Sequence, residues 1–401
     1  MLPLLSGLRI VDITTVILGP YATQILGDLG AEVVKVEPLA GDSMRPIPPA
    51  AAPGLSAIFA NHNRNKRSIA LDLKHADGKA VLARLIGHAD ALVHNIRPEA
   101  MDRLGFGFDA CRALNPRLVY CAAVGFGSRG PYAGRPAYDD IIQAASGFAG
   151  LFGMRDGAPV YAPSIVADKV AGLHVVYAVL AALLHRERTG GAAMQVEVPM
   201  FEAMAAFALT EHLAGATFED NGEMGYHRAL STERRPYTTA DGWIAVLPYT
   251  AEQWSRVLAE IGRPDIAKTA WFKDASERSR RIGELYELLS EVLLGKGTRA
   301  WLEVFDRLDV PCAPVNSPQS LLEDPHLAAV SFFEPRFASE SPVRRTLSQA
   351  MTVADVAPAP DRPPPPLGAD TRAVLADLGY SAEEIAALAR SPGIGGLGSG
   401  G

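Results

Sequence analysis

An acidic residue stands at the head of a long apolar run in this chain. Asp168, followed by Lys169, lies near the start of residues 164–188, which are rich in Val, Leu and Ala and typical of a buried helix. A carboxylate in that place can accept a hydrogen bond from a free N–H group of the helix, or it can act as a nucleophile in acyl transfer. The residue types alone leave both interpretations open.

A second acidic pair, Asp139 and Asp140, lies in "PAYDDIIQAASG" (residues 136–147). This pattern predicts the start of a helix, because acids there interact favourably with the helix dipole. Taken alone, Lys35, Lys74 and Arg103 are expected to be solvated charges, and Tyr138 to be part of a core.

One glycine motif raises the question of a dinucleotide cofactor. "GFGSRG" (residues 125–130) fits GxGxxG and follows a strand pattern, but Pro131 comes next in place of a helix. No acidic strand end follows about twenty residues later, so we expect neither a nicotinamide nor a flavin. The chain also has no P-loop, no GxSxG and no Cys/His spacing typical of a metal site, so no metal is expected.

The elements that must position these residues alternate in type along the first half of the chain. Apolar strand patterns interleaved with amphipathic helix patterns predict a parallel sheet with helices on both faces. The expected strands are residues 8–13, 32–37, 68–73, 91–95, 117–124 and 194–199, and the expected helices are residues 21–31, 76–89 and 164–188.

The pattern changes after Gly215. A polar segment at 221–242 is followed by a strand at 243–249, a helix at 250–262 that opens with a Thr250/Gln253 capping box, and a short strand at 310–315. We interpret 216–330 as a small α+β domain between 1–215 and a return segment, 331–392, that completes the large domain. The glycine-rich tail, 393–401, is expected to be disordered.

Composition limits the class of protein. The chain has 401 residues and a net charge of −7, which argues against nucleic acid or an anionic membrane as a partner. Its three cysteines follow no disulfide spacing and suit a reducing cytoplasm, and the N-terminus has no signal-peptide pattern. The apolar run from Val170 to Leu184 is short for a bilayer span, so we predict a core helix.

Many motifs in register resemble the class III CoA-transferases, the family of formyl-CoA transferase, carnitine CoA-transferase and α-methylacyl-CoA racemase. The resemblance runs through residues 7–45, "NRNKRSIALDLK" (63–74), "HNIRPEAMDRLGFGFD" (94–109), 115–147, 181–204 and 366–385. It implies an α/β fold with a doubly wound, Rossmann-like parallel-sheet large domain built from both chain ends, a small α+β domain and an interlocked homodimer.

The resemblance also assigns the site. It implies that Asp168 is the nucleophile, that coenzyme A binds as a substrate, and that Met200 lines the thioester pocket. The remaining CoA contacts that it implies are Val16, Ile17, Leu71, Lys74, Asn95, Ile96, Arg97, Arg103, Pro136, Ala137, Tyr138 and Asp139.

Some relatives close the site with a run of glycines, which is absent here. The corresponding stretch is "GEMGYHRALSTERRPY" (222–237), and we hypothesise that it still caps the site. The stretch contains Gly222 and Gly225, and in this hypothesis a basic residue of the loop pairs with an acceptor carboxylate. The candidates for that role are His227, Arg228, Arg234 and Arg235.

One residue position distinguishes the racemases from the CoA-transferases of this family. The racemases have a histidine directly before the first acid of the "YDD" motif, whereas this chain has Tyr138, a poor proton shuttle at neutral pH. We therefore expect CoA transfer from a short acyl-CoA, such as succinyl-CoA, to a small mono- or dicarboxylic acid. Intramolecular transfer within a diacid and racemisation stay as alternatives, and a mere CoA-binding protein would need Asp168 to be only a helix cap.

Overall fold

The computed structural model describes residues 1–335, 337 and 339–397, and the chain divides into two compact units. The first unit contains Met1–Ser146, Tyr161–Phe207 and the chain from Ala328 onward, and the second contains Gly147–Val160 and Ala208–Leu327. The inserted unit thus begins at 208, where the sequence suggested 216, and it takes in 147–160, which the sequence assigned to the large domain.

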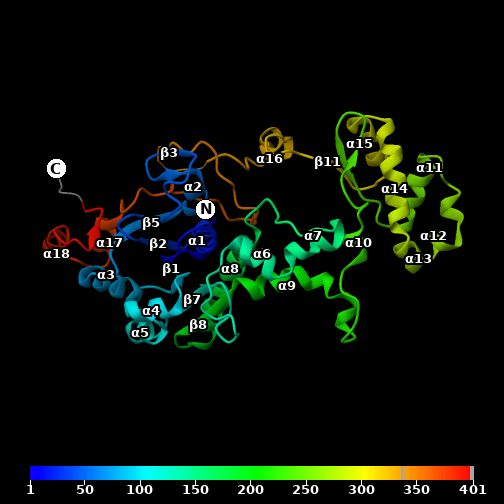
Figure 1. Cartoon of the computed structure of the whole chain (residues 1–401). Helices are drawn as coiled ribbons and strands as arrows, with labels where there is room; N and C mark the ends of the chain where they lie inside the picture. The colour runs from blue at the N-terminus through cyan, green and yellow to red at the C-terminus, as the bar shows by residue number, and fades with distance from the viewer. Residues whose placement is uncertain (336, 338, 398–401) are drawn as a thin grey trace. The chain divides into compact units, whose positions relative to one another are not determined.

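A seven-stranded sheet forms the centre of the first unit (Figure 1). Six strands are parallel, and a short seventh at one edge is antiparallel. In spatial order they are β12 (Ile394–Gly395), β5 (Lys66–Leu71), β2 (Glu32–Glu37), β1 (Arg9–Ile13), β6 (Ala91–His94), β7 (Val119–Val124) and β8 (Met194–Pro199).

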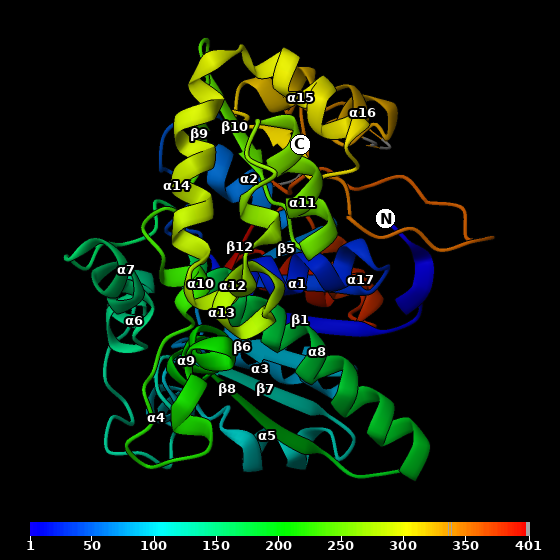
Figure 2. The same cartoon turned by 90° about the vertical axis from the view of Figure 1, so that its right-hand side faces the viewer.

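Helices cover both faces of this sheet because its strands are apolar on both sides. On one face, α1 (Leu18–Asp28) packs on α8 (Val166–Thr189), and α8 crosses β7 and β8 (Figure 2). On the other face, Val11 and Ile13 of β1 share a core with Leu82 of α3 (Ala76–Gly87) and Leu375 of α17 (Thr371–Asp377). The alternation of side chains along a strand sends neighbouring residues to these two cores.

The shorter elements of the first unit lie mainly in the connections. They are η1 (Pro3–Leu5), β3 (Ala50–Ala52), β4 (Leu55–Ser56), α2 (Ala57–Asn63), α4 (Pro98–Leu104), α5 (Phe108–Leu114), α6 (Asp139–Ala145), α9 (Met200–His212), α16 (Pro325–Ala329) and α18 (Ala382–Leu388), with α9 and α16 each crossing a unit boundary.

The start of helix α1 differs from its prediction by three residues and the start of strand β5 by two, and each difference has a physical reason. Helix α1 starts at Leu18 and not at 21, because Gly19 and Pro20 lie in its first turn, where proline is tolerated. Strand β5 starts at Lys66 and not at 68, because the Lys66 side chain is fully buried in an ion pair with Asp12, 3.0 Å away. A buried lysine leaves no apolar signal in the sequence.

The prediction of a disordered tail from 393 is wrong for residues 393–397. Ile394 pairs with Leu71 in the sheet, and Ile394 and Leu397 are both buried in the core. Gly396 has φ +77° and lies so close to the backbone of Gly368 that a Cβ atom would clash. The glycine therefore serves a close backbone contact. Residues 398–401 lie outside the described chain.

The second unit has a three-stranded antiparallel sheet in the order β11 (Cys312–Pro314), β10 (Trp243–Val246), β9 (Tyr237–Thr238). Trp254, Tyr286 and Phe305 are the largest fully buried side chains of its core. The predicted Thr250/Gln253 capping box is confirmed at the start of α11. Its other elements are α7 (Phe148–Asp156), η2 (Ala214–Thr217), α10 (His227–Leu230), α11 (Ala251–Glu260), η3 (Ile266–Lys268), α12 (Ala270–Lys273), α13 (Ala275–Arg280), α14 (Ile282–Val292), η4 (Leu293–Gly295), α15 (Thr298–Arg307) and η5 (Ser320–Glu323).

Candidate active site

The strand order of the first unit reverses next to β1. From β1 the chain passes to β2 and β5 on one side and then returns to β6, β7 and β8 on the other. The loops that leave the carboxyl ends of β1 and β6 therefore diverge and leave a crevice, which is the usual ligand site of an open α/β sheet.

A cleft of about 360 Å³ occupies this crevice, within the first unit. Nine of the residues assigned by resemblance line it, although they come from five separate segments of the chain. They are Val16, Asn95, Ile96, Arg97, Pro136, Ala137, Tyr138, Asp168 and Met200.

Five assigned residues do not line this cleft. Asp139 is buried behind it, and Ile17 is buried at the N-cap of α1. The Leu71 side chain is packed in the sheet core, so a ligand could reach this residue only through its backbone. Lys74 and Arg103 are solvent-exposed, as the residue types alone suggested. The prediction of a core position for Tyr138 is wrong, because the residue is 70% exposed at the cleft.

Asp168 is the third residue of α8 and does not cap it. The N-cap residue is Ile165, which supplies no side-chain hydrogen bond. The cap comes from another helix: the Oδ1 atom of Asp139 accepts the backbone N–H groups of Ala167 and Asp168, at 2.7 and 3.0 Å. The interpretation of Asp168 as the helix cap is therefore wrong, and its carboxylate is left to line the cleft.

The surroundings of Asp168 make its carboxylate hard to ionise. Burial raises its pKa from 3.8 to about 7, and the nearby charge of Asp139 adds to the effect. Among the described residues, no hydrogen bond or ion pair holds the Asp168 side chain. A carboxylate of this kind, in a cleft and with a shifted pKa, is typical of a group that reacts.

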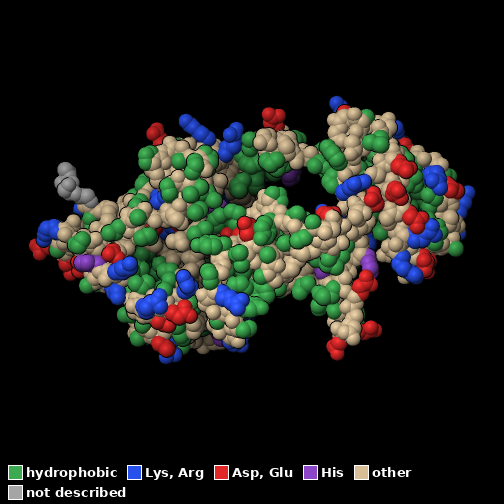
Figure 3. Space-filling model, viewed as in Figure 1, with side chains coloured by type: hydrophobic (Ala, Val, Ile, Leu, Met, Phe, Trp, Pro, Cys, Tyr) green, Lys and Arg blue, Asp and Glu red, His purple; other side chains and the backbone are tan. Residues whose placement is uncertain are grey.

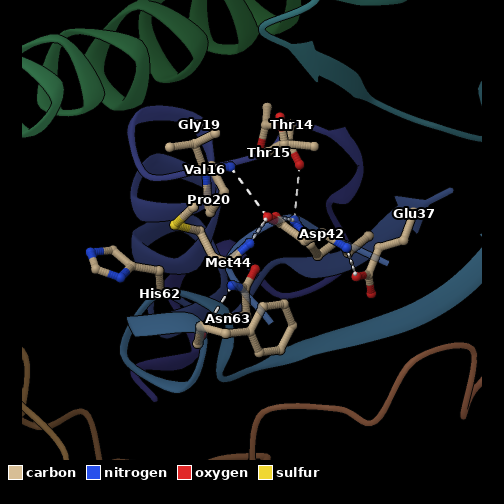
Figure 4. A network of polar contacts seen from close by, with 12 residues as sticks. Thr14, Thr15, Val16, Gly19, Pro20, Glu37, Asp42, Met44, His62 and Asn63 are labelled. Carbon is tan, nitrogen blue, oxygen red and sulfur yellow. Dashed lines mark hydrogen bonds and ion pairs between the residues drawn. The ribbon is translucent and has the colours of Figure 1, made fainter. Parts of the chain in front are cut away.

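A strained loop forms the wall of the cleft between β1 and α1. Val16 has φ +71°, which is costly for a β-branched residue. Asn95 holds the loop from β6: its Oδ1 atom accepts the N–H group of Thr15 at 3.0 Å, and its Nδ2 group donates to the Thr15 carbonyl at 2.8 Å. The Val16 N–H group points to Oδ1 of Asp42, at 3.4 Å (Figure 4).

A buried ionic network lies beneath this loop. The Lys35 ammonium donates to Asp42 and to the Thr14 carbonyl, both at 2.9 Å, and both charged side chains are fully buried. The prediction of a solvated Lys35 is therefore wrong, because these two acceptors replace water. Burial alone would raise the pKa of Asp12, but Lys66 and Lys35, with hydrogen bonds from two threonines, hold it at about 2. The network fixes the backbone of the loop from the interior side.

The sequence missed several residues that line the cleft. Gly125, Phe126 and Ser128 belong to the "GFGSRG" motif, which was tested only against dinucleotide binding. Arg135 and Glu197 also line it. The signal that could have found them is position, because all follow or end strands at the carboxyl edge of the sheet.

The predicted capping loop belongs to the second unit. Gly225 has φ +106°, and the Arg228 guanidinium lies 5.0 Å from the centre of the Tyr249 ring. Arg235 pairs with Glu233 at 3.3 Å, and the imidazole of His227 lies 3.9 Å from the Glu223 carboxylate. The role of this loop over the cleft stays a prediction.

Two whole-chain properties bear on the class of site. Across the residues that the structure describes, no group of three or more His, Cys, Asp and Glu side chains could hold a metal ion. One described helix, α8, is long and apolar enough by length and composition to cross a membrane. In the structure α8 packs on α1, α6, β7 and β8, as a core helix does.

Comparison with known proteins identifies the family of the chain. Residues 5–371 match the CoA-transferase family III. The chain is 31% identical to a succinate–glutarate CoA-transferase of Agrobacterium fabrum, over 94% of this chain and 96% of the relative. It is 32% identical to a formyl-CoA:oxalate CoA-transferase of Escherichia coli O157:H7, over 97% of this chain and 99% of the relative.

The fold is shared with solved structures as well. A CAIB/BAIF family protein from Brucella suis superposes with a TM-score of 0.80 at 28% identity, covering 94% of this chain and all of the other. The chain belongs to the class III CoA-transferase family and is an enzyme of that class.

Proposed function

We propose that this protein moves CoA from a short acyl-CoA, such as succinyl-CoA, to a small mono- or dicarboxylic acid, with Asp168 as the covalent carrier. The observation that carries the proposal is the Asp168 carboxylate itself. It lines a cleft at the reversal point of the sheet, it is not the cap of its helix, and its pKa is raised to about 7.

The exchange proceeds in four balanced steps. The Asp168 carboxylate attacks the acyl thioester carbonyl and expels CoA thiolate, which forms a mixed anhydride. The thiolate attacks the Asp168 carbonyl, which forms an aspartyl-CoA thioester and releases the donor acid as its carboxylate. The acceptor carboxylate then attacks this thioester and expels CoA thiolate again. Finally the thiolate attacks the acceptor acyl carbonyl, which releases the new acyl-CoA and restores Asp168.

The chemistry suits a carboxylate of raised pKa. A more basic carboxylate is a better nucleophile, and at neutral pH a group with a pKa near 7 is ionised in about half of the molecules. Every covalent intermediate is an activated acyl group, so the reaction does not pass through a stable ester that would stop it. Arg97 and Arg135 line the cleft, and their positive charges suit the phosphates of CoA.

The oxyanion of each attack needs N–H donors, and the first N–H groups of α8 are not available for it. Those of Ala167 and Asp168 are already bound to Asp139. The start of α1 is the better candidate, because Leu18 lines the cleft and the N-cap residue Ile17 supplies no side-chain hydrogen bond.

Racemisation is the less well supported alternative. It requires a second group that exchanges protons at neutral pH on the other side of the substrate α-carbon. None of the described residues that line the cleft is a histidine, and the position before Asp139 is Tyr138, which is 70% exposed. The same cleft would serve intramolecular CoA transfer within a diacid.

The proposal is tested by incubating the enzyme with succinyl-CoA and a panel of small carboxylic acids, and by following new acyl-CoA products by mass spectrometry. Trapping with hydroxylamine or borohydride should leave a mass change on the peptide that contains Asp168. Asp168→Ala should abolish both signals, while Asp140→Ala, an exposed neighbour of the site, should keep them. Full exchange by the Asp168→Ala variant would reject the proposal.

We also propose that the enzyme works as a homodimer, which the family resemblance implies. The support from this chain is an exposed apolar stripe on α8. Leu173, Tyr177 and Leu184 are 48%, 56% and 58% exposed at helical spacing on one side of this helix. Hydrophobic side chains also gather at the surface around α6 and α8 in Figure 3. A second copy of the chain is the occupant that we expect on this stripe.

A further inference from the structure

The start of α8 is capped from a distance. Neither Ser164 nor Ile165, the residues that precede the helix, caps it with a side chain: Ser164 Oγ accepts the Lys169 ammonium at 2.6 Å, and Ile165 has no polar side chain. Instead, Oδ1 of Asp139, which lies 28 residues before Ala167 in the sequence, accepts the N–H group of Ala167 and so caps the helix. A serine at the N-cap position would cap a helix equally well. A charged residue from α6 in this place therefore suggests a role beyond capping.

The second oxygen of Asp139 is also fixed. The Gln143 side chain, one turn later in α6, donates its amide N–H to Oδ2 of Asp139 at 2.6 Å. The amide oxygen of Gln143 accepts the Ala162 N–H group at 2.9 Å. Asp139 and Gln143 together therefore hold both the start of α8 and the segment that leads into it.

We propose that Asp139 is a positioning residue for Asp168: it binds the N–H groups that the Asp168 carboxylate would otherwise cap, and so keeps that carboxylate free and directed into the cleft. The catalytic part of this inference rests on the proposed function. Its electrostatic part does not, because the negative charge of Asp139 opposes ionisation of Asp168 whatever the substrate is.

Other titratable groups surround Asp168, and none duplicates this arrangement. Lys169 on α8 is turned to Ser164, and Tyr21 of α1 packs against Gly172, one turn further along α8. Asp140 of α6 is exposed. The charged and phenolic groups on the other walls of the cleft are Arg97, Glu99, Arg135, Tyr138 and Glu197. Burial and Asp139 are the causes of the raised pKa of Asp168.

The test compares Asp139→Asn with the matched control Asp140→Asn, the adjacent acid on the same helix. Carbon-13 NMR of aspartate carboxyl groups, with the Asp168 signal assigned from its loss in Asp168→Asn, gives the pKa of Asp168 without any substrate. Asp139→Asn should lower this pKa by about one unit or more, and Asp140→Asn should leave it near 7. An unchanged pKa in Asp139→Asn would overturn the electrostatic part of the inference.

Kinetics with the best acyl-CoA and acid pair then test the positioning. Asp139→Asn should move the acid limb of the rate profile to lower pH and reduce kcat roughly 10- to 100-fold, with little change in KM for the acyl-CoA. Asp139→Glu keeps the charge but displaces the carboxylate, so it should retain the raised pKa and still lose kcat. Wild-type kcat in Asp139→Glu would overturn the positioning role, and this variant serves also where Asp139→Asn fails to fold. If no acid accepts CoA but the NMR shift depends on Asp139, the proposed function fails and the electrostatic part of the inference stands.

Discussion

At the scale of single residues, the carboxylate that we propose as the nucleophile is placed where it weakens the fold. The pKa of Asp168 is 3.8 in an unfolded chain and about 7 in the folded one. Between these values the folded chain holds a proton that the unfolded chain has released, so stability falls as pH rises from about 4 to 7. Above pH 7 the loss is complete. Such a trade between stability and activity is common at active sites.

The fall of stability with rising pH gives a prediction for Asp168→Asn, whose amide resembles the protonated acid in shape and charge. At pH 8 the variant should be more stable than wild type by roughly 2–4 kcal/mol, which is the full shift reduced for contact of the carboxylate with water. At pH 5 the difference should be about 40% as large, because the unfolded chain is then already ionised while the folded chain still holds its proton. Urea unfolding of both proteins at the two pH values measures it. Equal differences at pH 5 and pH 8 would contradict the raised pKa, and Asp140→Asn should show no such pH dependence.

At the scale of elements, the loop from β1 to α1 is held by one residue of the cleft, Asn95, and by two buried residues outside it, Asp42 and Lys35. Val16 keeps its left-handed backbone because Asn95 fixes the preceding residue and Asp42 lies below its N–H group. Lys35 joins Asp42 to the Thr14 carbonyl. Two of the groups that fix this wall of the site, Lys35 and Asp42, therefore belong to the interior of the protein.

A double-mutant cycle on Lys35 and Asp42 tests this arrangement. Asp42→Asn alone leaves a fully buried ammonium without its carboxylate, and we expect a loss of about 3–5 kcal/mol in the free energy of unfolding. Lys35→Met combined with Asp42→Asn removes both charges, so the loss should be smaller than the sum of the single losses by at least ~1 kcal/mol. Additive losses in urea unfolding would show that the two groups do not depend on each other.

Strand β12 gives a second prediction at this scale. Ending the chain after Pro392 removes Ile394 and Leu397 from the core, together with the hydrogen bonds to β5. Burial of two aliphatic side chains predicts a loss of about 3 kcal/mol or more, visible as a lower Tm. Arg390→Ala, at an exposed position of the preceding turn, should leave Tm unchanged. A wild-type Tm in the truncated protein would show that this strand does not stabilise the fold.

At the scale of the whole molecule, periodicity predicted the α/β class and most strands of the parallel sheet, because apolar alternation is local. What it could not predict was contact between distant segments. Asp139 was correctly placed at a helix start, yet its partner is the start of another helix, and no local pattern carries that information. The same holds for Lys66, whose burial depends on Asp12, and for the tail, whose two aliphatic side chains looked too few to fold.

The exposed apolar side of α8 predicts the oligomeric state of the protein. Helix α8 is apolar over most of its length, and only 44% of its most apolar window is buried in the single chain. If a second copy covers the exposed stripe, light scattering after gel filtration should give twice the mass of one chain. Introducing charges with Tyr177→Glu and Leu184→Glu should then shift the protein to monomers, since burying two carboxylates in an apolar interface costs several kcal/mol. Leu114→Glu, an equally drastic change at an exposed leucine of α5, should leave the dimer intact. A wild-type monomer, or a dimer insensitive to both charges on α8, would exclude this interface.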